Sequence, residues 1–135
     1  MQNTDKETLF VGISNLILGL FIQENQFVKK NIESDHTLMR EIVAYIDEHY
    51  ATPLSLPKIA KVFGYSTNYF SQLFTSLFGI GLPQYINYIR VQKSIKLLAS
   101  HNVSTLYTYV GFQNPQQYFL NFKKYFGCSP KKYLS

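Results

Sequence analysis

The chain has 135 residues, enough for one domain or two small ones, and its formal net charge is +5. All eight Asp and Glu residues precede residue 49, so residues 49–135 carry nine Lys and Arg residues and no carboxylate side chain. Carboxylate acid–base catalysis is therefore excluded from residues 49–135, and a polyanion is their expected partner. The alternative is a basic surface that serves only solubility.

The sequence also argues against a secreted or membrane-spanning chain. Cys128 is the only cysteine and makes no internal disulfide, which fits a reducing cytoplasm. The start MQNTDKET is not a basic leader. The most apolar run, residues 9–22, contains Ser14 and Asn15 and is too short to cross a bilayer. We expect a cytoplasmic protein without a membrane partner.

Residues 1–35 predict an N-terminal apolar helix and a linker. Apolar side chains at helical spacing mark this helix: Leu9, Ile13, Leu16, Ile17 and Leu20. Because further apolar residues flank this stripe, the helix needs a partner in water. It is the tail of a preceding domain, a homodimer contact through residues 9–22, or a helix folded onto the rest; the first is favoured. KKNIESDHT, residues 29–37, is predicted to be a polar linker.

Residues 36–81 predict a first helical module. An amphipathic helix is expected from His36 to Tyr50, with Asp35 as its N-cap. ATPLSLPKIAKVFGYS then predicts a short helix opened by Ser55 and a glycine turn, and STNYFSQLFTSLFG predicts a second helix capped by Ser66. This is the helix-turn-helix layout, in which the second helix is presented to the DNA major groove.

Residues 82–100 predict a connector helix with two apolar stripes. One stripe contains Leu82, Tyr85, Ile86 and Ile89. The other, on nearly the opposite side, contains Tyr88, Val91, Ile95 and Leu98. A helix that packs on one core keeps a single stripe, so this helix is expected to join two modules.

Residues 101–135 repeat the first module. Six residue types recur at an offset of 48, among them Phe74 on Phe122 and Gly79 on Gly127, and upstream the offset is 47. The second copy therefore has one extra residue in its turn. Asn114 is the expected N-cap, with Pro115 at the first helical position, and SPKKYLS predicts a short terminal helix. The predicted fold class is all-α: two three-helix-type helix-turn-helix subdomains joined by a long connector helix and preceded by an N-terminal apolar helix.

The outward residues of both second helices suit DNA contacts. Asn and Gln bond the N6 and N7 of adenine, Ser and Thr contact bases or phosphates, and an apolar side chain touches the thymine methyl group. The predicted base-reading residues are Thr67, Asn68, Ser71, Gln72, Gln116, Gln117 and Leu120. The predicted phosphate contacts are Lys58, Lys61, Ser66, Thr75, Arg90, Asn114, Lys123 and Lys124. The competing interpretation is an ordinary polar helix face.

The sequence resembles the DNA-binding domain of AraC/XylS-type transcription regulators across roughly residues 38–134. The motifs that carry the resemblance are SLPKIAKVFGYSTNYFSQLF, FGIGLPQYINYIRVQKSIKLL and VGFQNPQQYFLNFKKYFGCSPKKY. The resemblance implies a bacterial cytoplasmic activator whose two second helices enter successive major-groove segments. Such domains commonly follow a sensor domain, so residues 1–30 are expected to be either the end of one or part of a short form without a sensor. The chain departs from the family pattern at Gln72, Thr75, Tyr107, Leu120 and Leu134.

Two other functions remain open. In a protein-interaction module, Phe119 and Leu120 would dock a polymerase subunit or a partner regulator while only the first unit reads DNA. An enzyme is not expected, because Cys128 has no His or acidic residue at a recognisable spacing. His49 has no metal-ligand spacing to another His or Cys, so no metal and no cofactor are expected.

Overall fold

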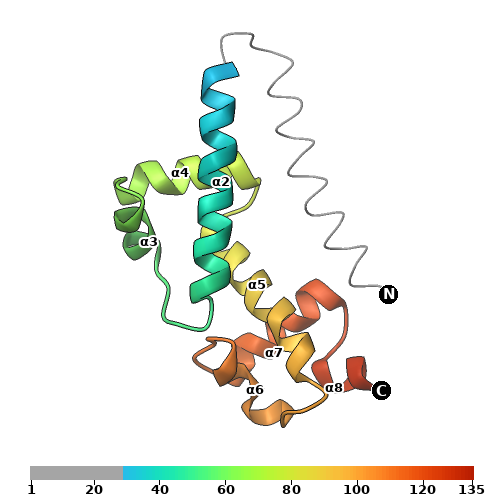
Figure 1. Cartoon of the computed structure of the whole chain (residues 1–135). Coiled ribbons are helices and arrows are strands. Elements are labelled where there is room, and N and C mark those ends of the chain that lie inside the picture. Colours follow the sequence, from blue (N-terminus) through green and yellow to red (C-terminus); the bar gives the residue numbers. More distant parts are fainter. Residues whose placement is uncertain (1–28) are drawn as a thin grey trace.

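The computed structural model of the chain describes residues 29–135, and this part is helical, with no strand (Figure 1). The helices follow in the order α2 (Lys29–His49), α3 (Leu56–Val62), α4 (Thr67–Phe78), α5 (Leu82–Leu97), α6 (Val103–Tyr109), α7 (Pro115–Phe126) and α8 (Pro130–Leu134). The all-α class is confirmed. The predicted apolar helix of residues 9–22 lies outside the described residues.

The first described helix, α2, begins earlier than the sequence predicts. Residues 29–35 form its first two turns, so the predicted polar linker is wrong and Asp35 lies inside the helix, not at its cap. The segment contains no Gly or Pro, and polarity alone does not break a helix. Further along, Ile42 and Ile46 are fully buried and anchor α2 to the first core.

The first unit consists of α2, α3 and α4 around a core that is rich in phenylalanine. Ser55 caps α3, and the Ser66 hydroxyl caps α4 by accepting a hydrogen bond from the Tyr69 N–H at 3.3 Å. α4 ends at Gly79, whose φ of 77° is the left-handed conformation that favours glycine. Phe70 and Phe74 are fully buried, so the hydrophobic face of α4 turns inward and its polar face outward.

The connector α5 gives one face to each unit, as its two stripes predict. Leu82, Tyr85 and Ile86 belong to the first core, whereas Val91 and Leu98 belong to the second. The helix ends at Leu97, before the predicted Ser100. Tyr88 is buried and meets the Tyr125 ring of α7 edge-on, with centroids 5.2 Å apart.

The second unit repeats the first with one extra turn residue. α7 has the same 12-residue length as α4, and its closing Gly127 has the same φ of 77° as Gly79. The Asn114 side chain caps α7 by accepting from the Gln117 N–H at 2.8 Å. Tyr107 stands where the first copy has the buried Ala60, and it packs half-buried at the edge of the second core. The predicted repeat is therefore confirmed at the level of helices and caps.

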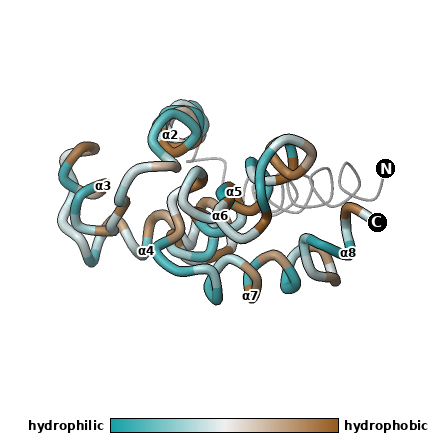
Figure 2. Tube along the Cα trace, turned by 90° about the horizontal axis from the view of Figure 1, so that it is seen from below, coloured by the Kyte–Doolittle hydropathy of each residue, from teal (hydrophilic) through white to brown (hydrophobic). Residues whose placement is uncertain are grey.

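The two second helices lie on a common side of the molecule. Figure 2 shows α4 and α7 together along one side and α2 on the opposite side. α5 lies between α2 and the other two helices. This arrangement follows from the opposed apolar faces of α5, because each face holds one unit.

Candidate nucleic-acid interface

The outward face of α4 carries the predicted amide side chains. Asn68 and Gln72 are exposed and lie one helical turn apart, so they point in the same direction. Thr67 and Ser71 are partly buried beside them. Thr75, one turn further, donates its hydroxyl to the Ser71 carbonyl at 3.0 Å, and this local bond occupies its only donor.

The outward face of α7 combines amide, apolar and basic side chains. Gln116 and Gln117 are exposed in the first turn, and Lys123 and Lys124 are exposed in the last. Between them Leu120 has 72% of its surface exposed and Phe119 has 38%. These two residues replace Ser71 and Gln72 of the first copy, so the face is mixed where that of α4 is polar.

Two predicted phosphate contacts are helix caps. Ser66 and Asn114 both use their side-chain oxygens to accept a first-turn N–H of their own helix. The other N–H groups of that turn have no partner within the helix, and with the positive end of the helix dipole they suit a phosphate oxygen. A phosphate at either end would therefore be held mainly by backbone N–H groups.

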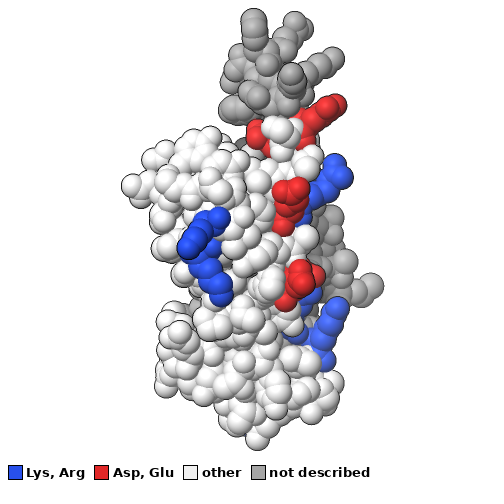
Figure 3. All heavy atoms as spheres, turned by 60° about the vertical axis from the view of Figure 1, so that its left-hand side comes forward, with Lys and Arg blue, Asp and Glu red and all other residues white. Residues whose placement is uncertain are grey.

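Within residues 33–135, the acidic residues are confined to one helix. Every acidic residue of this part lies on α2: Glu33, Asp35, Glu41, Asp47 and Glu48. Figure 3 shows acidic side chains in a line with some basic side chains beside them, and a separate basic group on the neighbouring surface. Lys93 of α5 pairs with Asp47 at 2.6 Å, so one carboxylate is partly neutralised within the chain. No carboxylate projects from α4 or α7, and a polyanion would meet no acidic side chain on either helix.

Arg90 lies between the two units. Its Nε donates to the Tyr50 carbonyl at 2.8 Å, and its Nη2 donates to the Thr52 carbonyl at 3.0 Å. Its guanidinium also lies 5.9 Å from the Phe112 ring centroid, over the second unit. Burial lowers the pKa of Arg90 from its ordinary value. The structure thus gives Arg90 a bridging role that the sequence does not predict, and its phosphate contact stays a prediction.

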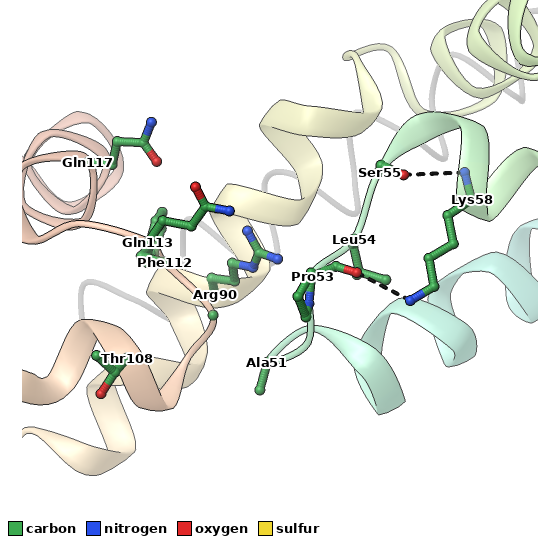
Figure 4. A pocket seen from close by; sticks show the side chains of 11 residues that line it. Ala51, Pro53, Leu54, Ser55, Lys58, Arg90, Thr108, Phe112, Gln113 and Gln117 are labelled. Atoms are coloured by element: carbon green, nitrogen blue, oxygen red, sulfur yellow. Dashed lines mark hydrogen bonds between the residues drawn. The ribbon is translucent and has the colours of Figure 1, made fainter.

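A cleft of about 760 Å³ separates the two units next to Arg90. Figure 4 shows Arg90, Gln113 and Gln117 on one side of it and Ser55 and Lys58 on the other. Lys58 donates to the Pro53 carbonyl at 3.3 Å across the α2–α3 loop. Gln113 was missed by sequence reasoning, because it occupies the extra turn residue that has no counterpart in the first copy.

The chemistry of these surfaces is that of binding. Among the described residues, no three His, Cys, Asp or Glu side chains gather as metal ligands would. In the same part of the chain, no helix is long and apolar enough to cross a membrane. The arrangement offers amide donors and acceptors, helix N-termini and lysines, which are the groups that contact bases and phosphates.

Comparison with known proteins agrees with this geometry. Residues 59–135 match the family described as helix-turn-helix domain. The HTH-type transcriptional regulator YijO of Escherichia coli K12 is 33% identical in an alignment of 141 positions. The alignment covers 98% of this chain and 47% of YijO. The chain thus spans about half the length of that relative. The multiple antibiotic resistance protein MarA of Escherichia coli K12 is 30% identical over 74% of this chain and 80% of MarA.

A solved structure shows the same fold. The DNA-binding domain of the global transcriptional factor AdpA, in complex with a target DNA, superposes with a TM-score of 0.65 and 27% identity. The superposition covers 70% of this chain and 86% of the AdpA chain. Sequence and structure agree on one assignment: this chain belongs to the AraC/XylS-type family of helix-turn-helix DNA-binding domains.

Proposed function

We propose that this chain is a sequence-specific transcription regulator that inserts α4 and α7 into two successive major-groove segments on one face of double-stranded DNA. The observation that carries the proposal is the repetition of α4 and α7, with equal lengths, equivalent caps and a common side of the molecule. All carboxylates of residues 33–135 lie on α2, on the opposite side.

The length of the connector supports two contacts about one DNA turn apart. α5 has 16 residues, or about 24 Å at 1.5 Å per residue. Successive major-groove segments on one face are about 34 Å apart. The proposal therefore requires the two reading helices to reach about 10 Å further apart than α5 is long. The expected site therefore has two boxes about 10 base pairs apart.

The relatives support a regulatory role. The AdpA domain is described in complex with its target DNA, and YijO as a transcriptional regulator. By analogy, residues 36–81 and 101–135 are the two reading units, residues 82–100 connect them, and residues 1–35 connect to a sensor domain. The regulator works as an activator in the bacterial cytoplasm, with RNA polymerase as a further partner. A homodimer contact through residues 9–22 is the alternative role of the N-terminal segment.

The residue assignments follow from the exposed faces. Thr67, Asn68, Ser71 and Gln72 read the first box, and Gln116, Gln117 and Leu120 read the second. The exposed lysines Lys58, Lys61, Lys123 and Lys124 hold phosphates, together with the helix starts at Ser66 and Asn114. Thr75 joins them when its hydroxyl exchanges the Ser71 carbonyl for a phosphate oxygen. Docking of a protein through Phe119 and Leu120 instead is not favoured, because the family match covers the second unit as a helix-turn-helix domain.

Selection of duplexes from a randomised DNA pool, followed by binding of the winner at several salt concentrations, tests the proposal. Two enriched boxes about one turn apart are expected. The affinity should fall as the salt concentration rises, because the counterions that binding releases then gain less entropy. Asn68→Ala should erase preference at one position of one box and leave the other box unchanged. Glu41→Gln, an exposed change on α2, is the control and should leave both boxes unchanged. Sequence-independent binding, or boxes without fixed spacing, would contradict the proposal.

A further inference from the structure

Leu120 is the most exposed large hydrophobic side chain in the part of the chain that the structure describes. It has 72% of its surface exposed, although its helical neighbours Tyr118 and Phe122 are fully buried in the second core. Its side chain therefore points away from the core. A single exposed leucine is common on protein surfaces, so its exposure alone carries no meaning.

The position of Leu120 on α7 is what makes its exposure informative. Gln116 lies one turn before it and Lys123 lies one turn after it on the same exposed face. In the first copy the equivalent residue is Gln72, whose amide faces outward from α4. The helix thus presents, in order, an amide, an isobutyl group and an ammonium group to whatever it meets.

We infer that Leu120, with the partly exposed Phe119 beside it, recognises thymine in the second box through the C5 methyl group; this inference rests on the proposed function. Thymine is the only natural base with a methyl group in the major groove, and an aliphatic side chain packs against it without a hydrogen bond. DNA is the expected partner of the apolar patch formed by Phe119 and Leu120. Lys123 and Lys124 lie next to this patch and α7 carries no carboxylate, so the surface attracts a polyanion.

The two boxes are therefore read by different chemistry. On α4 the amides of Asn68 and Gln72 select adenine through paired hydrogen bonds. On α7 only Gln116 and Gln117 can bond adenine in this way. At the position of Leu120, thymine is selected because its C5 methyl group is buried against the leucine side chain. Removal of one buried methyl group is expected to weaken binding about fourfold, which corresponds to ~0.8 kcal/mol.

The test replaces thymine by deoxyuridine, one position at a time, in the selected duplex bound by the full chain. Deoxyuridine lacks the methyl group and keeps every hydrogen-bonding atom. One or two positions in the second box should each lose about three- to fivefold in affinity. The box read by each unit is identified beforehand by Asn68→Ala, which relaxes selection only in the first box.

Variants connect the lost methyl group to Leu120. Leu120→Ala should weaken binding to the thymine duplex and abolish its difference from the deoxyuridine duplex. Leu120→Gln restores the residue type of Gln72 and should move the preference at that position from thymine towards adenine. Gln72→Ala, which alters the first box, is the matched control and should leave the methyl effect in the second box intact. Equal thermal unfolding of all variants shows that none has lost its fold.

The outcomes separate this inference from the proposed function. If two spaced boxes are selected but deoxyuridine has no effect anywhere in the second box, the methyl readout is wrong and the two-box function stands. If Leu120→Ala keeps full DNA affinity and loses transcription activation, the patch docks a protein and the inference is also wrong. If no box is enriched at all, the proposed function itself fails.

Discussion

Arg90 of the connector helix donates its Nε–H to the backbone carbonyl of Tyr50, 40 residues earlier in the chain, at 2.8 Å. A second bond from Nη2 to Thr52 holds the same loop, and the guanidinium lies over Phe112 of the second unit. One side chain thus joins the end of the first unit's long helix, the connector and the second unit's turn. This contact adds to the packing of both units on α5 and ties the turn of the second unit to the loop that follows α2.

The first prediction concerns Arg90→Lys. Lysine keeps the charge but cannot bond two carbonyls in a fixed fork, so the units should become less rigidly placed. The unfolding free energy should fall by about 1–2 kcal/mol. In binding measurements, the wild-type chain should lose affinity when one base pair is inserted between the boxes, and the variant should discriminate less between the two spacings.

An alternative outcome would assign Arg90 to DNA alone. If Arg90→Lys weakens binding equally at all spacings, reduces the salt dependence and leaves stability unchanged, then its bridging contacts do not set the geometry. Lys123→Ala is the reference for that behaviour, because Lys123 is exposed and is not among the residues that line the cleft. The variant should reduce the slope of log affinity against log salt concentration by about one, which corresponds to one phosphate contact. The preferred spacing of the two boxes should not change.

The second prediction concerns Gly111, which occupies the turn before α7. Its φ is +99°, and a Cβ there would lie 2.6 Å from the Tyr50 carbonyl oxygen and 2.8 Å from Arg90 Nε. Gly111→Ala should therefore combine backbone strain with a clash against backbone, and we expect a loss of about 3 kcal/mol or more in unfolding free energy.

The repeat supplies the matched control for Gly111. Gly64 occupies the same turn of the first unit with φ +79°, but a Cβ there meets nothing within 4 Å. Gly64→Ala should cost only the backbone strain, about 1 kcal/mol. Urea unfolding of both variants measures the difference, and equal losses would show that the inter-unit contact does not crowd Gly111.

The third prediction concerns Tyr118, the fully buried counterpart of Phe70. Its hydroxyl donates to the Ser94 hydroxyl of α5 at 2.8 Å, and Ser94 in turn donates to the Val91 carbonyl. Tyr118→Phe copies the residue of the first unit and should cost about 1 kcal/mol. Ser94→Ala leaves the buried Tyr118 hydroxyl without its acceptor and should cost more, about 1–3 kcal/mol.

A double-mutant cycle tests whether the two hydroxyls act as a pair. In the combined Tyr118→Phe and Ser94→Ala variant, the loss should be smaller than the sum of the single losses. Additive losses would mean that the hydrogen bond contributes little and that packing alone sets the effects. Thermal unfolding of the four proteins at one pH provides the measurement.

The fourth prediction concerns alkaline pH. The pKa of Tyr85 is raised from 10.0 to about 12. Burial is the largest cause, and the charges of Asp47 and Tyr88 act in the same direction. Burial also raises the pKa of Tyr118 and of Tyr125. Because the folded-state pKa values exceed the unfolded ones, the stabilisation is complete below pH 10 and is lost as pH rises from about 10 towards 12.

Tyr85→Phe isolates the contribution of that residue. The unfolding free energy of the wild-type chain should fall more steeply between pH 10 and 12 than that of the variant, by about 2–3 kcal/mol across the window. Urea unfolding at pH 9, 10.5 and 11.5 measures the two slopes. Parallel slopes would show that Tyr85 ionises as readily in the folded chain as in the unfolded one.

Local interactions explain why much of this fold could be predicted from sequence. The caps Ser55, Ser66 and Asn114 each accept from the N–H three residues further on, so residue type and position suffice to predict them. Helical periodicity likewise predicted both faces of α5. The polar residues 29–35 predict a linker, but they form the start of α2, because no Gly or Pro breaks the helix there.

The sequence by itself determined the twin units, their caps, the two-faced connector and the confinement of acidic residues to the front part of the chain. Only the tertiary structure decided that Arg90 bridges the units, that Tyr118 bonds Ser94 and that a cleft separates α3 from α7. These contacts join residues 24 to 40 positions apart, and their formation depends on how whole helices pack. No local pattern encodes such distances, because the relative placement of helices follows from the shape of the two complete cores.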